Sequence, residues 1–293
     1  MKCFDCPRKC GAERTEAAVG GVCSSPRLPR IARAAAHFGE EPCISGKRGS
    51  GTVFFSGCNL KCVFCQNHEI SRGKVGKTVS VDRLTQIMLE LEASGVHNIN
   101  LVTGSHYIPE IAQALKEAHL SIPVCWNSSG YESVESLRQL DGLVNIYMPD
   151  MKYCSHELAG RYSAAPDYPE VAEKAIAEMY RQVGSFELDE NGMLKSGVLI
   201  RHLILPGQAE NSMDVIDFVA DNYPDGAVLF SLMSQYTPMP GTESFPELQE
   251  RVSSELNESL IHYMRMRGIV YGFWQETDAA TDAMIPSFDL TGV

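Results

Sequence analysis

Three cysteines lie close together in the segment FFSGCNLKCVFCQN, which covers residues 54–67. They are Cys58, Cys62 and Cys65, with C-x3-C-x2-C spacing. Three thiolates this close in sequence can hold three irons of a four-iron cluster and leave the fourth iron open to a small molecule. Because the next cysteine downstream is Cys125, the spacing alone predicts a soft-metal site with three close ligands and no obvious fourth.

A zinc site is the main alternative for these three thiols. A structural zinc ion normally completes its tetrahedron with a fourth Cys or His, and His68 lies close enough in sequence to supply it. However, Cys58 directly follows the apolar run GTVFFSG, which we expect to be a buried strand. Barrels and open α/β sheets keep their sites at the carboxyl ends of strands, so this context favours an iron–sulfur cluster over zinc or inert thiols.

Four more cysteines lie near the amino terminus, with C-x2-C-x3-C-x12-C spacing. They are Cys3, Cys6, Cys10 and Cys23. The surrounding stretch is rich in Arg, Ala and Gly and has little apolar periodicity, so a bound metal would supply the missing core. Zinc and a second iron–sulfur cluster both suit four thiolates. We therefore predict that residues 1–50 form a Cys-rich extension with a second metal and that residues 51–293 form the main domain.

The other three cysteines, Cys43, Cys125 and Cys154, have no comparable partner spacing. We expect them to be buried free thiols, since an unpaired cysteine often behaves as a small hydrophobic residue. Cys43 lies in the segment EEPCISGKRGSG, which leads directly into the first expected strand. This position makes Cys43 the one of the three that could approach the mouth of the cluster site.

Length and composition indicate an enzyme-sized protein with one main domain. The chain has 293 residues, and 44% of them are hydrophobic, which is enough for a large core. The formal net charge of −12 argues against binding to a nucleic-acid backbone. There is no apolar run of about 18 residues and no signal-peptide core at the amino terminus. We expect a reducing, cytoplasmic setting with neither nucleic acid nor membrane as a partner.

Strand and helix signals alternate after residue 50. The strand signals are mostly continuous apolar runs, which are typical of strands buried on both faces of a parallel sheet. They cover residues 52–56, 98–103, 123–127, 143–148, 198–205, 227–232 and 269–273. Such repeated units predict a parallel sheet with right-handed crossovers, either doubly wound or closed into a complete or partial barrel.

Three amphipathic helices are expected between these strands. One covers residues 80–94, with Ser80 able to cap its start, and another covers residues 167–183. The last long helix is predicted to start at Ser244, because Glu247 three residues later completes a capping-box pattern.

The cysteine spacing and its neighbours resemble the radical S-adenosylmethionine (SAM) enzymes. The resemblance implies a partial (β/α)6 TIM-type barrel with the cluster loop after the first strand, which decides between the sheet arrangements above. It also implies a [4Fe–4S] cluster whose open iron is chelated by the amino and carboxylate groups of SAM. An electron from a donor such as flavodoxin or ferredoxin then cleaves SAM, and the resulting 5′-deoxyadenosyl radical abstracts a substrate hydrogen.

Within that family the chain most resembles the activating enzymes of glycyl-radical enzymes, in the branch called pyruvate formate-lyase activating enzyme-like. The similar segments span nearly the whole chain and are CPRKCG, HFGEEPCISG, CQN, NINLVTGSHY, NSSGY, YMPDMKY, RHLILPG and LMSQYTP. The resemblance implies a glycyl-radical enzyme as partner. A small-molecule or peptide substrate remains open, as does a non-catalytic zinc-binding interaction module.

The resemblance also implies which residues hold SAM. Activating enzymes have a D-T-N-G-like turn after the third strand, an M-x-D-x-K segment after the fourth and an arginine on the fifth that reaches the SAM carboxylate. The matching residues here are Asn127, Ser128 and Gly130 for the first, Met148, Asp150 and Lys152 for the second, and Arg201 for the third. The cofactor contacts are assigned to Asn127, Ser128, Asp150, Lys152 and Arg201. Asp150 and Lys152 lie two apart on an extended segment and can point to one face, although an ordinary surface ion pair would look the same.

Two segments depart from the family pattern. The second strand ends in VTGSHY instead of a G-G-E-type segment, so the roles of Thr103, Gly104 and Ser105 stay open. The sixth strand ends in SLMSQY and lacks the histidine of pyruvate formate-lyase activase, which leaves Gln235 as a polar substitute. His202 is expected to be a satisfied core histidine, and we assign no residue as a catalytic acid or base.

Overall fold

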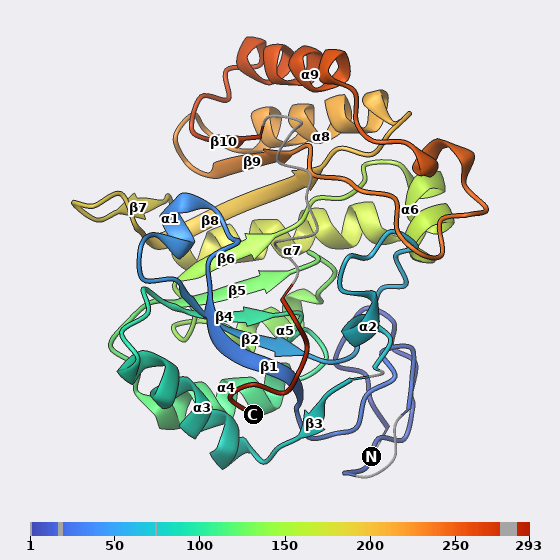
Figure 1. The fold of residues 1–293 in the computed structure, drawn as a ribbon. Coiled ribbons are helices and arrows are strands. Elements are labelled where there is room, and N and C mark those ends of the chain that lie inside the picture. Colours follow the sequence, from blue (N-terminus) through green and yellow to red (C-terminus); the bar gives the residue numbers. More distant parts are fainter. Residues whose placement is uncertain (1, 17–19, 74, 276–285) are drawn as a thin grey trace.

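The computed structural model describes residues 2–16, 20–73, 75–275 and 286–293 (Figure 1). Its centre is one sheet with the strand order β10-β9-β8-β6-β5-β4-β2-β1-β3, and β7 pairs with β8 off this path. The strands are β1 (Arg30–His37), β2 (Ser50–Phe55), β3 (Lys77–Thr78), β4 (Ile99–Val102), β5 (Val124–Ser128), β6 (Ile146–Pro149), β7 (Glu187–Leu188), β8 (Leu194–Leu203), β9 (Leu229–Met233) and β10 (Gly272–Trp274).

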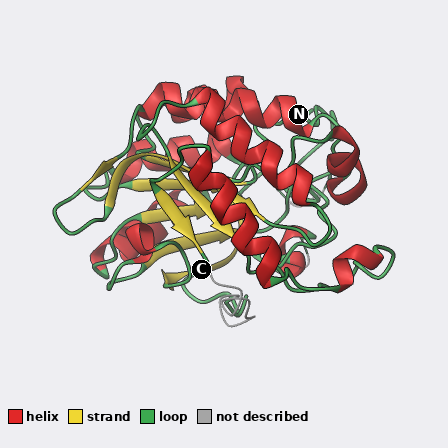
Figure 2. Cartoon of the chain, turned by 90° about the horizontal axis from the view of Figure 1, so that it is seen from above, coloured by secondary structure: helices red, strands yellow, loops and turns green. Residues whose placement is uncertain are grey.

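Seven strands, from β2 to β10 without β3 and β7, run parallel and pair in the order of the sequence. Helices follow them and lie around the strands, as Figure 2 shows from above. The helices are α1 (Pro42–Ser45), α2 (His68–Ser71), α3 (Val81–Ala93), α4 (Ile108–Ala118), α5 (Val134–Leu137), α6 (His156–Ser163), α7 (Tyr168–Val183), α8 (Ala209–Asn222) and α9 (Ser254–Met266), with short 3-10 turns η1 (Arg138–Leu140) and η2 (Pro246–Gln249).

The expected partial barrel of parallel strands is confirmed. Within the described residues, β10 and β3 end the sheet without pairing to each other, so the barrel stays open. All seven predicted strand segments contain a parallel strand. The main core lies between the sheet and the helices and includes the fully buried side chains of Trp126, Tyr147 and Phe230.

The sequence did not predict β1, which runs antiparallel beside β2. Its sequence RIARAAAH has few of the β-branched and aromatic residues that are typical of strands. Residues 30–37 thus contribute to the main sheet, although they fall in the segment that we assigned to the Cys-rich extension. The division of the chain at residue 50 stays a proposal.

The carboxyl-terminal residues 286–293 pair with the free side of β1. Leu290 N donates to Ala32 O at 3.0 Å, and Ala34 N donates to Thr291 O at 2.8 Å. The ring of Phe288 packs edge-on against Phe54 of β2, with 5.5 Å between ring centroids. The end of the chain therefore covers an edge of the sheet that β3 pairs with at only two residues.

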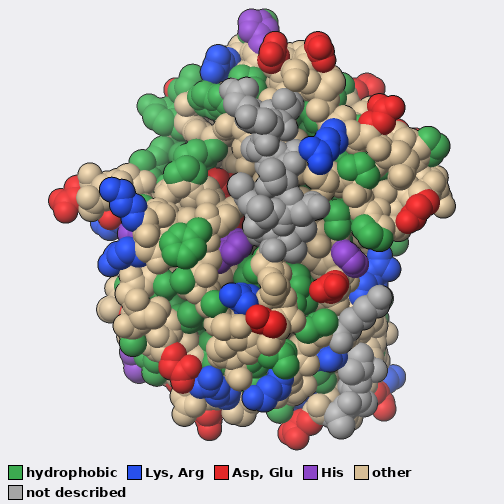
Figure 3. All heavy atoms as spheres, in the orientation of Figure 1, with side chains coloured by type: hydrophobic (Ala, Val, Ile, Leu, Met, Phe, Trp, Pro, Cys, Tyr) green, Lys and Arg blue, Asp and Glu red, His purple; other side chains and the backbone are tan. Residues whose placement is uncertain are grey.

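Surface charges are mixed. On the face shown in Figure 3, basic side chains are interspersed with acidic ones. None of the helices in the described ranges combines the length and apolarity needed to span a bilayer.

The predicted start of the last long helix is wrong. Residues 246–249 form only a 3-10 turn, and α9 begins at Ser254, with the hydroxyl of Ser253 accepting a hydrogen bond from Leu256 N at 3.2 Å. The carboxylate of Glu247 pairs instead with Arg161 at 2.7 Å. Because that tertiary ion pair engages Glu247, the capping box expected at Ser244 does not form. The cap at Ser80 is present, with Arg83 N donating to its hydroxyl at 3.1 Å.

We expect Ser253→Ala to lower the free energy of unfolding by about 1 kcal/mol, because it removes the acceptor for the first turn of α9. The matched control is Ser244→Ala, which changes the exposed serine that the sequence pattern predicted as the cap. Urea unfolding of both variants measures the difference. An equal loss in both variants would show that Ser253 is not the cap.

Candidate active site

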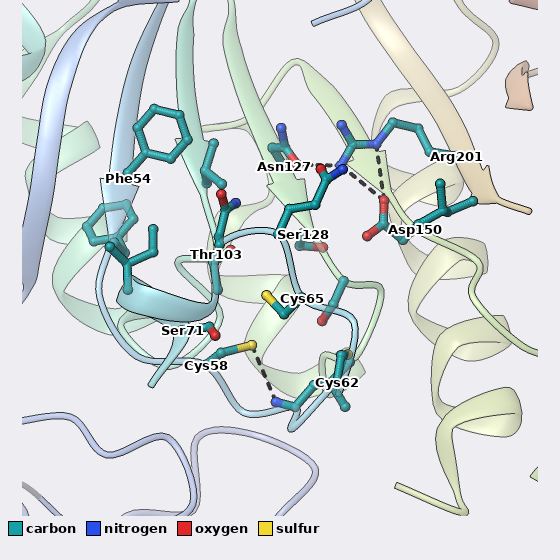
Figure 4. A pocket seen from close by; sticks show the side chains of 18 of the residues that line it. Phe54, Cys58, Cys62, Cys65, Ser71, Thr103, Asn127, Ser128, Asp150 and Arg201 are labelled. Carbon is teal, nitrogen blue, oxygen red and sulfur yellow. Dashed lines mark hydrogen bonds and ion pairs between the residues drawn. The ribbon is translucent and has the colours of Figure 1, made fainter. Parts of the chain in front are cut away.

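A cavity of about 240 Å³ opens at the carboxyl ends of the parallel strands (Figure 4). Residues from the loop after β2, the ends of β4, β5, β8 and β9, and the segment after β6 line it. Its polar lining residues include Glu40, Cys58, Cys62, Cys65, Gln66, Asn67, Thr103, Asn127, Ser128, Asp150, Lys152, Arg201 and Gln235. The structure thus brings together the three cysteines and all five residues that the sequence assigned to a cofactor.

The three cysteines lie on the loop that follows β2. Gly57 starts this loop at φ +91°, and a Cβ placed there would lie 2.0 Å from Ser25 Oγ, so only glycine fits. Leu60 N donates to Cys58 Sγ at 3.4 Å, and the hydroxyl of Ser163 donates to Cys62 Sγ at 3.0 Å. In Figure 4 the three side chains lie together below the strand ends.

The electrostatics of these thiols suit a bound metal cluster. Burial, with a smaller contribution from the neighbouring Cys62 and Cys65, raises the pKa of Cys58 to about 12. Burial also raises the pKa of Cys62, while Lys152 opposes that shift. Thiolates buried side by side need a compensating positive charge, and bound irons supply it.

The three thiols and His68 do not converge on one point. In the described part of the chain, no three His, Cys, Asp or Glu side chains are arranged to hold one metal ion. His68, the candidate fourth zinc ligand, therefore does not complete a site with the three thiols. A four-iron cluster presents separate irons to separate thiolates, so its ligands do not have to converge on one point. The arrangement of the three thiols therefore suits a four-iron cluster, the cofactor that the resemblance implies.

A buried network of charges lies beside the cysteines. Arg201 on β8 donates to Asn127 Oδ1 at 2.6 Å and through Nε to Asp150 Oδ1 at 3.1 Å. Lys152 Nζ donates to the other Asp150 oxygen at 2.5 Å. Burial opposes ionisation of Asp150, but Lys152 and Arg201 outweigh it and hold its pKa below the ordinary value. Asp150 and Lys152 are only 19% and 18% exposed, so this is not an ordinary surface ion pair.

Sequence reasoning missed Glu40, which precedes α1 and reaches into the same network. Its Oε1 accepts hydrogen bonds from Asn100 at 3.1 Å and Asn127 at 3.0 Å, and its Oε2 pairs with Arg201 at 3.2 Å. Burial raises the pKa of Glu40, while Arg201 lowers it. Glu40 lies in the segment HFGEEPCISG, which stood out in the sequence only for its resemblance to the activating enzymes. Cys43 in the same segment is buried, as expected of a free thiol. Cys43 does not line the cavity and packs instead with other apolar residues, including Cys125 and Ile146.

The structure also places the residues at the ends of the second and sixth strands whose roles the sequence left open. Thr103 lines the cavity and has a left-handed backbone, with φ +61°. Gly104 is not part of the lining, and a Cβ built on it would lie 2.7 Å from the side chain of Ile111 and 2.9 Å from that of Trp126. Gln235 lines the cavity after β9. His202 is a core residue, with Nδ1 2.7 Å from Met151 O and Nε2 2.9 Å from Ser212 Oγ. Burial lowers the pKa of His202 to about 4, so the ring is neutral at pH 7.

A second missed carboxyl, Glu132, ties together the ends of β4 and β5. The hydroxyls of Ser105 and Ser128 donate to its two oxygens, and the residue is 1% exposed. Burial raises its pKa from 4.5 to about 7, although the two serines lower it. Because Ser128 lines the cavity, Glu132 positions part of the site without contacting the space itself.

Glu132 gives the folded protein a specific pH dependence. A carboxyl whose pKa is raised on folding holds its proton more tightly in the folded state, so its stabilising effect is complete below pH 4.5 and is lost as the pH rises through 7. We expect wild type to lose about 2 kcal/mol more than Glu132→Gln between pH 5.5 and 8. Urea unfolding at both pH values measures this, with the exposed Glu135→Gln as control. Parallel pH profiles for wild type and Glu132→Gln would contradict the assignment.

Comparisons with known proteins show the family and the fold of this chain. The sequence model of the radical SAM superfamily matches residues 52–219, which include the cysteine loop, Asn127, Asp150 and Arg201. The Methanocaldococcus jannaschii protein MJ0674 is 30% identical over 230 residues, which are 75% of this chain and 62% of that protein. The chain therefore spans less than two thirds of that relative.

Two solved structures share the fold. They are SuiB of Streptococcus suis, at 15% identity and a TM-score of 0.50, and HydG, a maturase of the [FeFe]-hydrogenase, at 15% identity and a TM-score of 0.51. Each match covers 74% of this chain and less than half of the other, 47% of SuiB and 48% of HydG.

Proposed function

Because this chain belongs to the radical SAM superfamily, we propose that it is an enzyme that cleaves SAM reductively at a [4Fe–4S] cluster held by Cys58, Cys62 and Cys65. The observation that carries the proposal is the shared cavity, in which the three thiols face the network of Asp150 and Arg201. When bound, the cluster would supply one electron, and SAM would supply the 5′-deoxyadenosyl radical that abstracts a substrate hydrogen.

The charged network suits the methionine end of SAM, which carries both a carboxylate and an amino group. Lys152 and Arg201 offer positive charge to the carboxylate. Asp150 offers negative charge to the amino group. Arg201 is held in place by acceptors on Glu40, Asn127 and Asp150, so its orientation is fixed before the ligand arrives.

Apolar side chains complete the cavity and protect the chemistry from water. They are Phe54, Phe55, Leu60, Phe64, Ile70, Val102, Leu203 and Met233. A site closed by such residues excludes solvent from a reactive carbon radical and limits its quenching. No acid or base is required of the protein for the abstraction, which agrees with the neutral, fully bonded His202.

For the substrate, we propose a glycine on a glycyl-radical enzyme. Support comes from the sequence segments that resemble activating enzymes, including YMPDMKY and RHLILPG. The rival substrates are a small molecule and another peptide. The rival without catalysis, a zinc-binding interaction module, is disfavoured by the arrangement of the three thiols around a shared cavity.

The first test is SAM cleavage. Wild-type protein reconstituted anaerobically with iron and sulfide, and then reduced in the presence of SAM, should release 5′-deoxyadenosine. Cys58→Ala should lower the rate at least about 100-fold because one cluster ligand is lost. Chromatography of the products measures the rate, and Cys154→Ala, which removes a thiol outside the cavity lining, serves as control. Fully loaded wild-type protein that releases none with several reductants would refute the proposal.

The second test addresses the substrate. Reduced protein mixed with SAM and a co-purified partner should produce a glycine-centred radical on that partner, since the radical persists on the protein that has been activated. Electron paramagnetic resonance detects it, and substitution of the partner glycine by alanine is the control. If 5′-deoxyadenosine forms while no partner protein acquires a radical, the activase proposal is wrong and a small molecule or peptide is the substrate.

A further inference from the structure

The amino-terminal cysteines lie on two tight turns that face each other. In the first turn, Lys9 N donates to Cys6 O at 3.0 Å, and the backbone is left-handed at Lys9, just before Cys10. In the second turn, the backbones of Gly20 and Ser25 pair at 3.3 Å around Cys23.

Gly21 lies between the sulfurs of the two turns. A Cβ built on Gly21 would lie 3.0 Å from Cys10 Sγ and 4.0 Å from Cys23 Sγ, so both sulfurs face the same small residue. Cys3 joins them because its N donates to Ala12 O and its O accepts from Gly11 N, both at 3.0 Å. The thiol of Cys6 is close enough to the other three for their charges to raise its pKa, after burial as the main cause.

This stretch has almost no apolar core of its own. Among the described residues up to 25, the buried side chains are Cys6, Arg14, Cys23 and Ser25, and the only large aromatic one, Phe4, is 57% exposed. The buried apolar groups are therefore the cysteines themselves. A segment of this size without a hydrophobic core usually depends on a metal or a cross-link for its fold.

The same stretch packs directly on the loop that carries the other three cysteines. Arg8, between Cys6 and Cys10, donates through Nε to Asn59 O at 2.8 Å and through Nη1 to Ala164 O at 2.5 Å. A third bond from Arg8 reaches Ser163 O at 3.4 Å, and the hydroxyl of Ser163 donates to Cys62 Sγ. Arg8 thus contacts the residue after Cys58 and the partner of Cys62.

We propose that Cys3, Cys6, Cys10 and Cys23 bind a second metal centre of the thiolate type, one zinc ion or one iron–sulfur cluster, and that Arg8 uses this anchored turn to brace the Cys58–Cys65 loop. In the described structure the four thiols are near each other without surrounding one point. Cys10 is exposed, so its side chain has room to turn toward the other three when the metal binds.

The site is tested in the full chain with Cys58, Cys62 and Cys65 all changed to Ala. Elemental analysis and the visible spectrum after anaerobic purification should show about one zinc, or about four irons with sulfide, still bound per chain. Adding Cys6→Ser and Cys23→Ser should remove it. A folded triple variant, as judged by circular dichroism, that retains no stoichiometric metal would overturn the proposal.

If the triple variant does not fold, Cys6→Ser/Cys23→Ser in the otherwise wild-type chain gives the same answer. It should lose one zinc or about four irons relative to wild type while the visible absorption of the other cluster remains. An unchanged metal content would overturn the proposal. Neither experiment depends on SAM cleavage, so a failure here is distinct from a failure of the proposed function.

The brace is tested with Arg8→Ala. We expect the amino-terminal metal to remain, while the [4Fe–4S] cluster is lost to a chelator about 10-fold faster, since residues that hold ligands in place affect metal retention on this scale. The matched control is Lys9→Ala, at the exposed neighbour of Arg8, and Arg8→Lys should restore part of the retention. Equal rates of bleaching in wild type and Arg8→Ala would show that Arg8 does not brace the loop.

Discussion

The interior of this barrel depends on one buried guanidinium. Arg201 is 13% exposed and lies between two carboxylates, those of Glu40 and Asp150. A charge in this position is tolerated only if partners surround it, and here they come from the segment before α1, from β5 and from the segment after β6. Because each partner belongs to a different part of the chain, the pairing of the strands and the shape of the cavity are tied to the same side chain.

The cysteine loop is positioned by a different set of contacts. Its entry requires a glycine against Ser25, and its thiols bond to the loop's own backbone and to Ser163 at the end of α6. These partners are hydroxyls and backbone groups without charge, so the compensating charge for thiolates has to come from the metal and from Lys152. The strand ends therefore provide the charges for a ligand, and the loop provides the thiols for a metal.

Much of this could be predicted from the sequence, because the signals were local. Each of these signals is contained in a short stretch of sequence. They are the spacing of Cys58, Cys62 and Cys65, the apolar run of each parallel strand and the polar residues that follow it. Glu40 and Glu132 could not be found in this way, since their roles arise from contacts with Arg201 and with Ser105 that only the fold creates. The start of α9 was mispredicted for the same reason, because the contact of Glu247 with Arg161 arises only in the fold.

The strand β1 shows how weak local preference can be overridden. Its Arg and Ala residues have little intrinsic tendency to form a strand, yet β2 on one side, and Thr78 and residues 290–291 on the other, satisfy its backbone.

That arrangement makes the last residues of the described chain a protective cover. An uncovered strand edge with hydrogen-bonding groups exposed is a template for pairing with other molecules. By lying along β1, with Phe288 against Phe54, residues 286–293 occupy that template, and Pro286 is part of the cavity wall. One short peptide thus both covers a strand edge and contributes to the wall of the cavity.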